Sequence, residues 1–166
     1  MKKHARLATA ANQPSPALAT LEPSRVPRYR VMLVCETMGT GLAESVRDSS
    51  TAAALFRPCF DGLDREQFVV CGLDGKHRVI GINVVSVGSL TLSIVHPREM
   101  FKPLILMNAA AVICAHNHPS GDVTPSPEDC ALTKRLREAG VLLGITLLDH
   151  LILGDSCYSF ADQGWP

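Results

Sequence analysis

One short apolar run, AAVICAH at residues 110–116, restricts the fold of this chain more than any other segment. It has the length of a strand and no alternating polar residues, which predicts a strand buried on both faces of a sheet. A helix pattern occupies residues 126–140, and two further strands are expected within residues 142–160, paired around a corner at Asp149 and His150. This order predicts an α/β domain with a mixed β-sheet flanked by helices.

Two runs further upstream predict an antiparallel hairpin. Residues 66–74, EQFVVCGLD, and residues 77–88, HRVIGINVVSVG, are rich in β-branched and apolar residues, and Asp74 with Gly75 suits a tight turn between them. Residues 89–96 alternate apolar and polar side chains, as a half-buried strand does.

Capping residues and prolines mark two further helices. One is expected to begin at Asp48 or Ser49 and to end at Pro58. The other begins at Pro97, because proline suits the first turn of a helix, and Pro103 is expected to kink or shorten it.

The length of 166 residues fits one domain with a tail. Residues 1–28 are rich in Ala, Pro and Ser and predict a flexible basic tail, residues 29–60 a helical or mixed lead-in, and residues 61–166 the main domain. Within the lead-in, residues 30–36 form either a short strand or a helix turn. Hydrophobic residues make up 46% of the chain, which is enough for a proper core.

The basic residues of the tail predict only weak contact with nucleic acid. Residues 1–30 hold six Lys/Arg and one Glu, which leaves ten Lys/Arg against fifteen Asp/Glu in the rest of the chain. With at most about six phosphates neutralised, log K should fall with log salt with a slope no steeper than roughly −5, and affinity should be negligible at physiological ionic strength. Nanomolar, sequence-specific binding by the full chain in about 0.2 M salt would contradict this prediction.

The cysteines and the hydropathy pattern predict a cytoplasmic bacterial protein without membrane contact. The six cysteines form no CxxC pair, and several lie inside apolar runs, as in a reducing compartment. The apolar stretch at residues 7–11 is too short for a signal peptide. No run approaches the roughly 18 apolar residues that a membrane-spanning helix needs.

His116 and His118 are candidate metal ligands at the end of the central strand. Residues two apart project from the same face, and a Cα spacing of roughly 6.5–7 Å lets both imidazoles reach one ion, while Asn117 points the other way. Asp129, in the first turn of the next helix, can complete a His-His-Asp set. Such a set leaves a fourth zinc position open for water, as catalytic zinc sites do.

A local explanation exists for the same residues. Ser126 followed by Asp129 is a capping-box pattern, and acidic residues are favourable near a helix start. A lone HxH pair is also more often structural or accidental than functional. The coincidence of two histidines on one face with an acidic residue one loop later favours the metal site over the cap alone.

Residues 116–129, HNHPSGDVTPSPED, resemble the metal-binding signature of the RadC family, the bacterial branch of the JAMM (MPN-type) metalloprotease fold. The family pattern is His-x-His-Pro, six residues, Ser, two residues and Asp, and the chain matches every spacing. VHPREMFK at 95–102, NAAAVI at 108–113 and LLDHLILGD at 147–155 resemble RadC segments as well. The resemblance covers residues 61–166 and implies a cytidine-deaminase-like/JAMM (MPN) fold.

The resemblance also implies roles for single residues. It implies a catalytic glutamate on an earlier strand, where Glu66 falls and would act as general base. Glu99 is the competitor, but it lies at a helix start, where the helix dipole explains it. Ser126 is a candidate donor to the oxyanion of a tetrahedral intermediate. The implied activity is that of a Zn²⁺-dependent metallopeptidase acting on a peptide or amide bond of an unidentified protein or peptide.

Two departures from the family keep an alternative open. Asn117 stands where eukaryotic JAMM deubiquitinases carry Ser or Thr, so activity on ubiquitin-like proteins is not carried over. Longer RadC proteins also have an N-terminal helix-hairpin-helix region, for which this chain has no room, so the short form is expected. The alternative is a DNA-repair or mobile-element accessory protein with a structural or vestigial metal site.

Two other histidines have simpler explanations. His150, beside Asp149, either orients a metal ligand or is an ordinary hydrogen-bonded core residue, and the second case is the commoner one. His96, which precedes Pro97, is expected to be structural.

Overall fold

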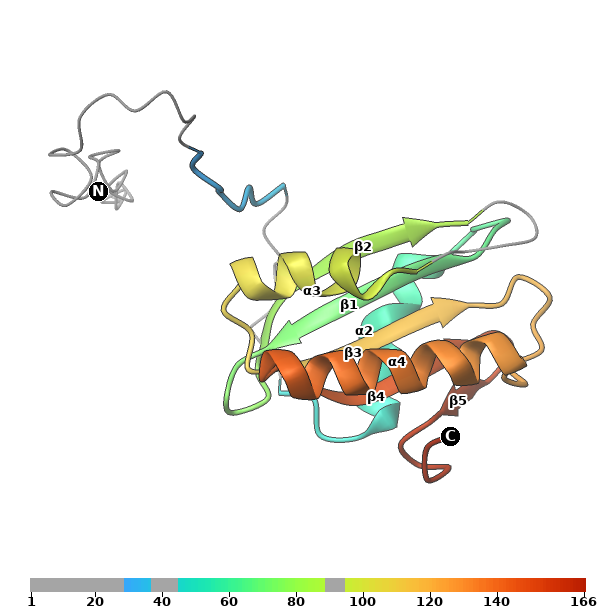
Figure 1. The fold of residues 1–166 in the computed structure, drawn as a ribbon. Helices are drawn as coiled ribbons and strands as arrows, with labels where there is room; N and C mark the ends of the chain where they lie inside the picture. The colour runs from blue at the N-terminus through green and yellow to red at the C-terminus, as the bar shows by residue number, and fades with distance from the viewer. Residues whose placement is uncertain (1–28, 37–44, 89–94) are drawn as a thin grey trace, which may run out of the picture. The chain divides into compact units, whose positions relative to one another are not determined.

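In the part of the chain that the structure describes, a five-stranded mixed sheet forms the centre of the fold, with the strand order β2-β1-β3-β4-β5 (Figure 1). The strands are β1 (Gln67–Leu73), β2 (Val79–Val87), β3 (Ala111–Asn117), β4 (Thr146–Leu153) and β5 (Cys157–Ser159). Only β3 and β4 pair in parallel, and every other neighbouring pair is antiparallel. The mixed sheet expected from the order of elements is therefore confirmed.

This computed structural model describes residues 29–36, 45–88 and 95–166. The chain divides into two units, Met1–Val31 and Met32–Pro166, and every helix and strand named here belongs to the second. The predicted tail over residues 1–28 and most of the strand predicted over residues 89–96 lie outside the described residues.

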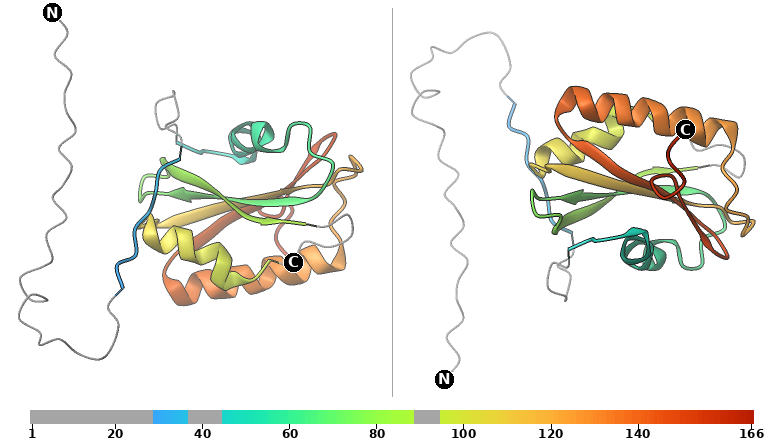
Figure 2. Two further views of the ribbon diagram at one scale, coloured as in Figure 1. Left: turned by 90° about the horizontal axis from the view of Figure 1, so that it is seen from above. Right: turned by 90° about the horizontal axis from the view of Figure 1, so that it is seen from below.

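Helices cover both faces of the sheet. They are α2 (Ser49–Phe60), α3 (Pro97–Leu106) and α4 (Pro127–Leu143). Figure 2 shows α2 on one side of the sheet and both α3 and α4 on the other, which gives three layers. The parallel pair β3 and β4 is joined through α4, as a parallel connection requires a crossover.

Alternate residues of the strands feed two separate cores. Phe68 and Val70 of β1 pack in the core under α3 and α4, whereas Val69 and Cys71 pack in the core under α2. All seven residues of β3 are buried, which confirms the prediction from its unbroken apolar sequence. Strand β3 is therefore the central, buried strand of the sheet, and the residues after its C-terminal end leave from the middle of the sheet.

The hairpin of β1 and β2 is confirmed, but its turn is longer than predicted. The loop runs over residues 74–78, and the left-handed conformation falls on His77 (φ 58°) rather than on Gly75. The Asp74 carboxylate accepts hydrogen bonds from the N–H groups of Lys76 and Arg78 and from the Arg78 side chain, and these bonds lower its pKa to about 2. The side chain of Asp74 therefore organises a wider loop.

Two predicted helix ends are wrong. Helix α2 continues past Pro58 to Phe60, so this proline lies inside the helix, two residues before its end. Helix α4 continues past Gly140 to Leu143 and ends at Gly144, which has a left-handed φ of 70°. A Cβ on Gly140 would lie 2.5 Å from the carbonyl oxygen of Ile145, so this glycine allows a close approach of two backbones instead of ending the helix.

Two other segments also differ from the prediction. The expected corner at Asp149 and His150 does not exist, because β4 continues through both residues, with a register shift at Leu148, and the chain reverses at residues 154–156. The apolar residues within 30–36 form neither a strand nor a helix turn and are exposed. Helix α3 ends at Leu106, only three residues after Pro103, in agreement with the expected shortening.

Candidate metal centre

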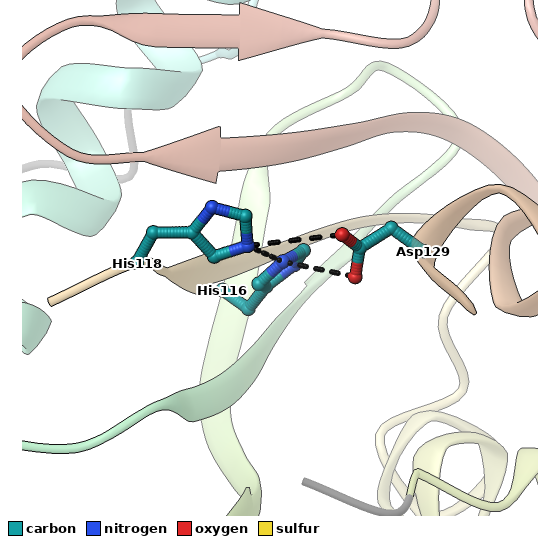
Figure 3. A group of neighbouring side chains, drawn as sticks. All are labelled: His116, His118 and Asp129. Carbon is teal, nitrogen blue, oxygen red and sulfur yellow. Dashed lines mark hydrogen bonds and ion pairs between the residues drawn. The ribbon is translucent and has the colours of Figure 1, made fainter. Parts of the chain in front are cut away.

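Two imidazoles and one carboxylate converge where β3 ends and α4 begins (Figure 3). His116 Nε2 lies 3.2 Å from Asp129 Oδ1 and 3.1 Å from His118 Nε2, and His118 Nε2 lies 3.7 Å from Asp129 Oδ2. One ligand atom from each of the three residues lies within 4.8 Å of the others. The structure therefore brings together the three residues that the sequence predicted as metal ligands.

Strand β3 and its neighbours fix the two histidines. The ring of His116 is stacked on the ring of Phe68, with 6.1 Å between the ring centroids and 11° between the planes. The backbone N–H of His118 donates to the carbonyl of Leu153, and its Nδ1 lies 2.7 Å from the carbonyl oxygen of Asp122. Because a carbonyl only accepts, His118 Nδ1 carries the proton of this contact, and Nε2 is the ring nitrogen that faces Asp129.

The N-terminus of α4 fixes the carboxylate. Ser126 is the N-cap, and its backbone N–H and its hydroxyl both donate to Asp129 Oδ2, at 2.8 Å and 2.6 Å. The Asp129 N–H donates back to Ser126 Oγ at 3.1 Å. The capping box and the convergence with the histidines are thus both present, since Oδ2 caps the helix while Oδ1 faces His116.

The electrostatics of Asp129 suit a cation. Burial alone would raise the pKa of this carboxyl. Hydrogen bonds from His116 and Ser126, together with the charge of His116, outweigh burial and hold the pKa of Asp129 well below its usual range. Asp129 is therefore ionised at neutral pH. Imidazole nitrogen and carboxylate oxygen are normal zinc ligands, and three such ligands leave a fourth position open, so the donor set fits Zn²⁺.

His150 lies directly behind His116. It is completely buried, its Nε2 lies 2.9 Å from His116 Nδ1, and its Nδ1 lies 2.6 Å from the hydroxyl oxygen of Thr133. The sequence left open whether His150 orients a ligand or only fills the core, and the structure places it in contact with His116, one of the candidate ligands. Thr133 was missed by sequence reasoning; only its position four residues after Asp129, one helical turn on, could have indicated it.

Asn117 brackets the position of Glu66. Its side-chain Oδ1 accepts from the N–H of Gln67 at 2.8 Å, and its Nδ2 donates to the carbonyl of Arg65 at 3.1 Å. Glu66 lies between these two bonds, is half-buried, and accepts at its own carbonyl from the N–H of Gly88. The side chain of Asn117 thus fixes the backbone on both sides of Glu66. The position of Asn117 in the strand did not by itself suggest this role.

Replacing Asn117 by Ala should destabilise the protein by about 1–3 kcal/mol, because two backbone groups would lose their partner. Chemical unfolding would measure this loss. Asn83→Ala, in the edge strand β2, is the matched control and should change the unfolding free energy by less than about 0.5 kcal/mol. Equal effects of the two substitutions would contradict the bracketing role of Asn117.

The competing residues have local roles. Glu99 lies in the first turn of α3, where its carboxylate forms an ion pair with Arg98 at 3.1 Å. His96 is the N-cap of α3, and its Nδ1 accepts from the N–H of Arg98 at 3.1 Å. Both residues thus contribute to the start of α3, as the sequence suggested.

The loop after His118 rests on the turn between β4 and β5. Gly121 has a φ of +85°, its N–H donates to the His118 carbonyl, and its own carbonyl accepts from Asp155. A Cβ on Gly154 would lie only 2.3 Å from the carbonyl oxygen of Gly121. The two backbones are in direct contact, and this contact supports the loop that carries His118.

Gly154→Ala should therefore cost at least about 2 kcal/mol of unfolding free energy, because backbone has to move to accept the methyl group. Gly75→Ala is the matched control, since a Cβ there meets no atom within 4 Å. Thermal unfolding of both variants measures the difference. Equal unfolding midpoints for the two variants would show that the backbone around Gly154 accepts the methyl group without loss of stability.

A three-layer domain with a mixed sheet and a His-His-Asp group at the end of its central strand is a JAB/MPN-like domain. The chain matches the RadC-like JAB domain family over residues 46–165 and belongs to this family. The match includes α2 as well as the whole sheet.

Relatives from several bacteria agree with this assignment. A UPF0758 protein of Shouchella clausii is 52% identical over 115 residues, which are 69% of this chain and 50% of the relative. One of Moorella thermoacetica is 53% identical over 69% of this chain and 50% of its own length. One of Desulfitobacterium hafniense is 44% identical over 89% of this chain and 72% of its own length. The chain spans about half the length of most of these relatives.

Among the described residues, no helix is long and apolar enough to cross a membrane.

Proposed function

We propose that this chain is a zinc-dependent hydrolase that cleaves a peptide or other amide bond. The observation that carries the proposal is the convergence of His116, His118 and Asp129, whose ligand atoms lie within 4.8 Å of one another. Three protein ligands with a fourth position open are typical of catalytic rather than structural zinc sites. No disulfide joins Cys59, Cys71, Cys114, Cys130 or Cys157, which suits the cytoplasm as the compartment of this activity.

Glu66 is proposed as the general base. In the ladder between β1 and β3, Phe68 pairs with His116, and two more residues of the same antiparallel register would set Glu66 opposite His118. Glu66 is outside the group of three ligands, so its carboxylate is free to take a proton. Zinc, when bound, supplies a coordinated water whose pKa falls from 15.7 to about 7. Glu66 would accept the proton of the attacking water and return it to the leaving amine.

Ser126 is proposed to have two roles. Its hydroxyl donates to Asp129 Oδ2 and so leaves Oδ1 as the carboxylate oxygen that faces His116. Rotation about its Cβ–Oγ bond can redirect the same proton to an oxyanion that develops on the substrate. Oxyanion donors of this kind are worth about 2.7–4 kcal/mol when they have been removed from other enzymes.

A small cavity beside the site favours a polymeric substrate. It has a volume of about 200 Å³ and is lined by His118, Asn117 and Gly121 on one side and by Arg57 and Phe60 of α2 on the other. Sites for small molecules usually have about 300–1,000 Å³. The cavity therefore suits one side chain of an extended peptide that continues across the surface.

The proposal is tested by metal removal with a mixed peptide library as substrate. Protein loaded with one equivalent of zinc should cleave peptides, chelator-treated protein should lose the cleavage, and added zinc should restore it. Mass spectrometry of the products identifies the bonds that are cut. Cleavage that survives full metal removal, or no cleavage by the zinc-loaded chain, would contradict the proposal.

A further inference from the structure

We infer that Arg57, near the end of α2, is a positioning residue for His118, on which it acts through two segments of backbone. The first segment is the turn between β4 and β5 at residues 154–156, and the second is the loop at residues 119–122 that follows His118. The inference rests on the zinc site of the proposed function and does not depend on which bond is hydrolysed.

The first step links α2 to the turn. The guanidinium of Arg57 donates to the carbonyls of Gly154 and Ser156, at 3.3 Å and 3.1 Å. A basic residue in the last turn of a helix is usually explained by the carbonyls at the end of its own helix. These two acceptors instead lie 97 and 99 residues further along the chain, so the local explanation does not account for the contact. Arg57 therefore holds the turn against α2 through two charge-assisted hydrogen bonds.

The second step links the turn to the loop. Between the two carbonyls that Arg57 holds, the N–H of Asp155 donates to the carbonyl of Gly121 at 3.0 Å. The Asp155 carboxylate lies against the same glycine, since a Cβ on Gly121 would lie 2.8 Å from Asp155 Cγ. Gly154 is in backbone contact with Gly121 as well. A shift of the turn is therefore passed directly to the loop.

The third step links the loop to the ring of His118. The N–H of Gly121 donates to the carbonyl of His118 at 3.0 Å, and the carbonyl of Asp122 lies 2.7 Å from His118 Nδ1. The N–H of His118 donates to the carbonyl of Leu153, the residue directly before the turn. The loop and the turn thus hold the backbone and Nδ1 of His118, and so they set the direction in which its Nε2 faces Asp129.

The other two candidate ligands are held by different parts of the fold. His116 is stacked on Phe68 of β1, and Asp129 accepts from Ser126 at the start of α4. Neither contact involves α2 or the turn at residues 154–156. A change at Arg57 is therefore expected to act on the site through His118.

The tests avoid peptide substrates for a structural reason. Arg57 also lines the cavity that the proposed function assigns to a substrate side chain, so cleavage by an Arg57 variant would combine two effects. Arg57→Met keeps the apolar stem and removes the donors, whereas Arg57→Lys keeps a charged donor. Arg47→Met is the matched control, because Arg47 is exposed just before α2 and its side chain donates to the Ser45 hydroxyl, not to the turn.

The first test is amide hydrogen exchange of the metal-free protein. The amides of Gly121 and Asp155 should exchange about fivefold faster or more in Arg57→Met, because the turn loses two hydrogen bonds to α2. They should stay within about twofold of wild type in Arg47→Met. Unchanged exchange in Arg57→Met would overturn the inference, and so would a uniform increase over the whole sheet, which would show a loss of global stability alone.

The second test is zinc affinity by competition with a chelator. Loss of a direct hydrogen-bond partner of a metal ligand typically lowers metal affinity about 10–100-fold. Because Arg57 acts through backbone, a smaller loss of about 3–10-fold is expected for Arg57→Met, with Arg57→Lys between this variant and wild type. Arg47→Met should bind zinc within about twofold of wild type.

Three results separate the inference from the proposed function. Equal zinc affinities of Arg57→Met and Arg47→Met overturn the inference, even if the wild-type protein cleaves peptides. Faster exchange at Gly121 and Asp155 together with weaker zinc binding in Arg57→Met supports the inference, even where no peptide is cleaved. A wild-type protein that binds no zinc contradicts the proposed function, and amide exchange of the metal-free protein then still decides whether Arg57 holds the loop.

Discussion

Glu66→Gln is expected to lower kcat/KM for the best-cleaved peptide by about 10²–10⁴-fold or more while zinc stays bound at one equivalent per chain. Glutamine has nearly the same shape as glutamate but cannot take a proton from the attacking water, which is the contribution of a general base. Glu66 is outside the group of three metal ligands, so its loss should not release zinc. Steady-state kinetics and metal analysis of the same preparation measure both effects.

Glu99→Gln is the matched control for this experiment. Glu99 is half exposed in the first turn of α3 and forms an ion pair with Arg98, so its replacement should cost at most about 1 kcal/mol of stability and leave kcat/KM within about twofold. A reversal of the two results would assign the base to Glu99. Full activity of Glu66→Gln would remove Glu66 from the mechanism altogether.

The parts of the fold that could be predicted depend on local patterns. The unbroken apolar sequence of β3 predicts burial on both faces, and runs of β-branched and apolar residues around a turn signal predict β1 and β2. Ser126 and Pro127 mark the start of α4 because N-caps are determined by neighbouring residues. The ligands His116 and His118 follow from the two-residue period of a strand.

The features that were missed depend on contacts between distant segments. Gly140 resembles a helix stop, but the backbone of Ile145 packs against it, and only the tertiary structure shows that contact. The extent of β4 through Asp149 was missed because its carboxylate is satisfied inside the core by the N–H groups of His150 and Ala161 and by the hydroxyl of Ser159. A charged residue inside a strand is easily mistaken for a turn residue in the sequence when its hydrogen-bond partners lie elsewhere in the chain.

The candidate site divides in the same way. His116, His118 and Asp129 lie within fourteen residues of sequence, so their spacing alone indicates a shared ion. The residues behind them are spread further, since His150 lies 34 residues after His116 and meets it only because β4 pairs with β3. Candidate ligands can thus be recognised from a local motif, whereas a residue such as His150, which contacts one of them, can be recognised only from the register of the sheet.

Asp129→Asn is expected to reduce bound zinc from about one equivalent per chain to near zero. Asparagine can still accept from the Ser126 N–H through its side-chain oxygen, so the start of α4 should survive, but the ionised oxygen that faces His116 is lost. A neutral amide is a much poorer zinc ligand than a carboxylate. Metal analysis after dialysis against trace zinc measures the occupancy.

Unfolding in the presence of zinc gives a second, independent measure. Zinc at about 100 times its dissociation constant should stabilise the wild-type protein by about 2.7 kcal/mol, and this increment should vanish in Asp129→Asn. Asp122→Asn is the matched control, because the Asp122 side chain accepts only from Thr124 in the same loop and its backbone carbonyl, which contacts His118, is unchanged. It should keep both the bound zinc and the stabilisation. An Asp129→Asn protein that still holds one zinc per chain would contradict the carboxylate ligand and reduce the site to its two histidines.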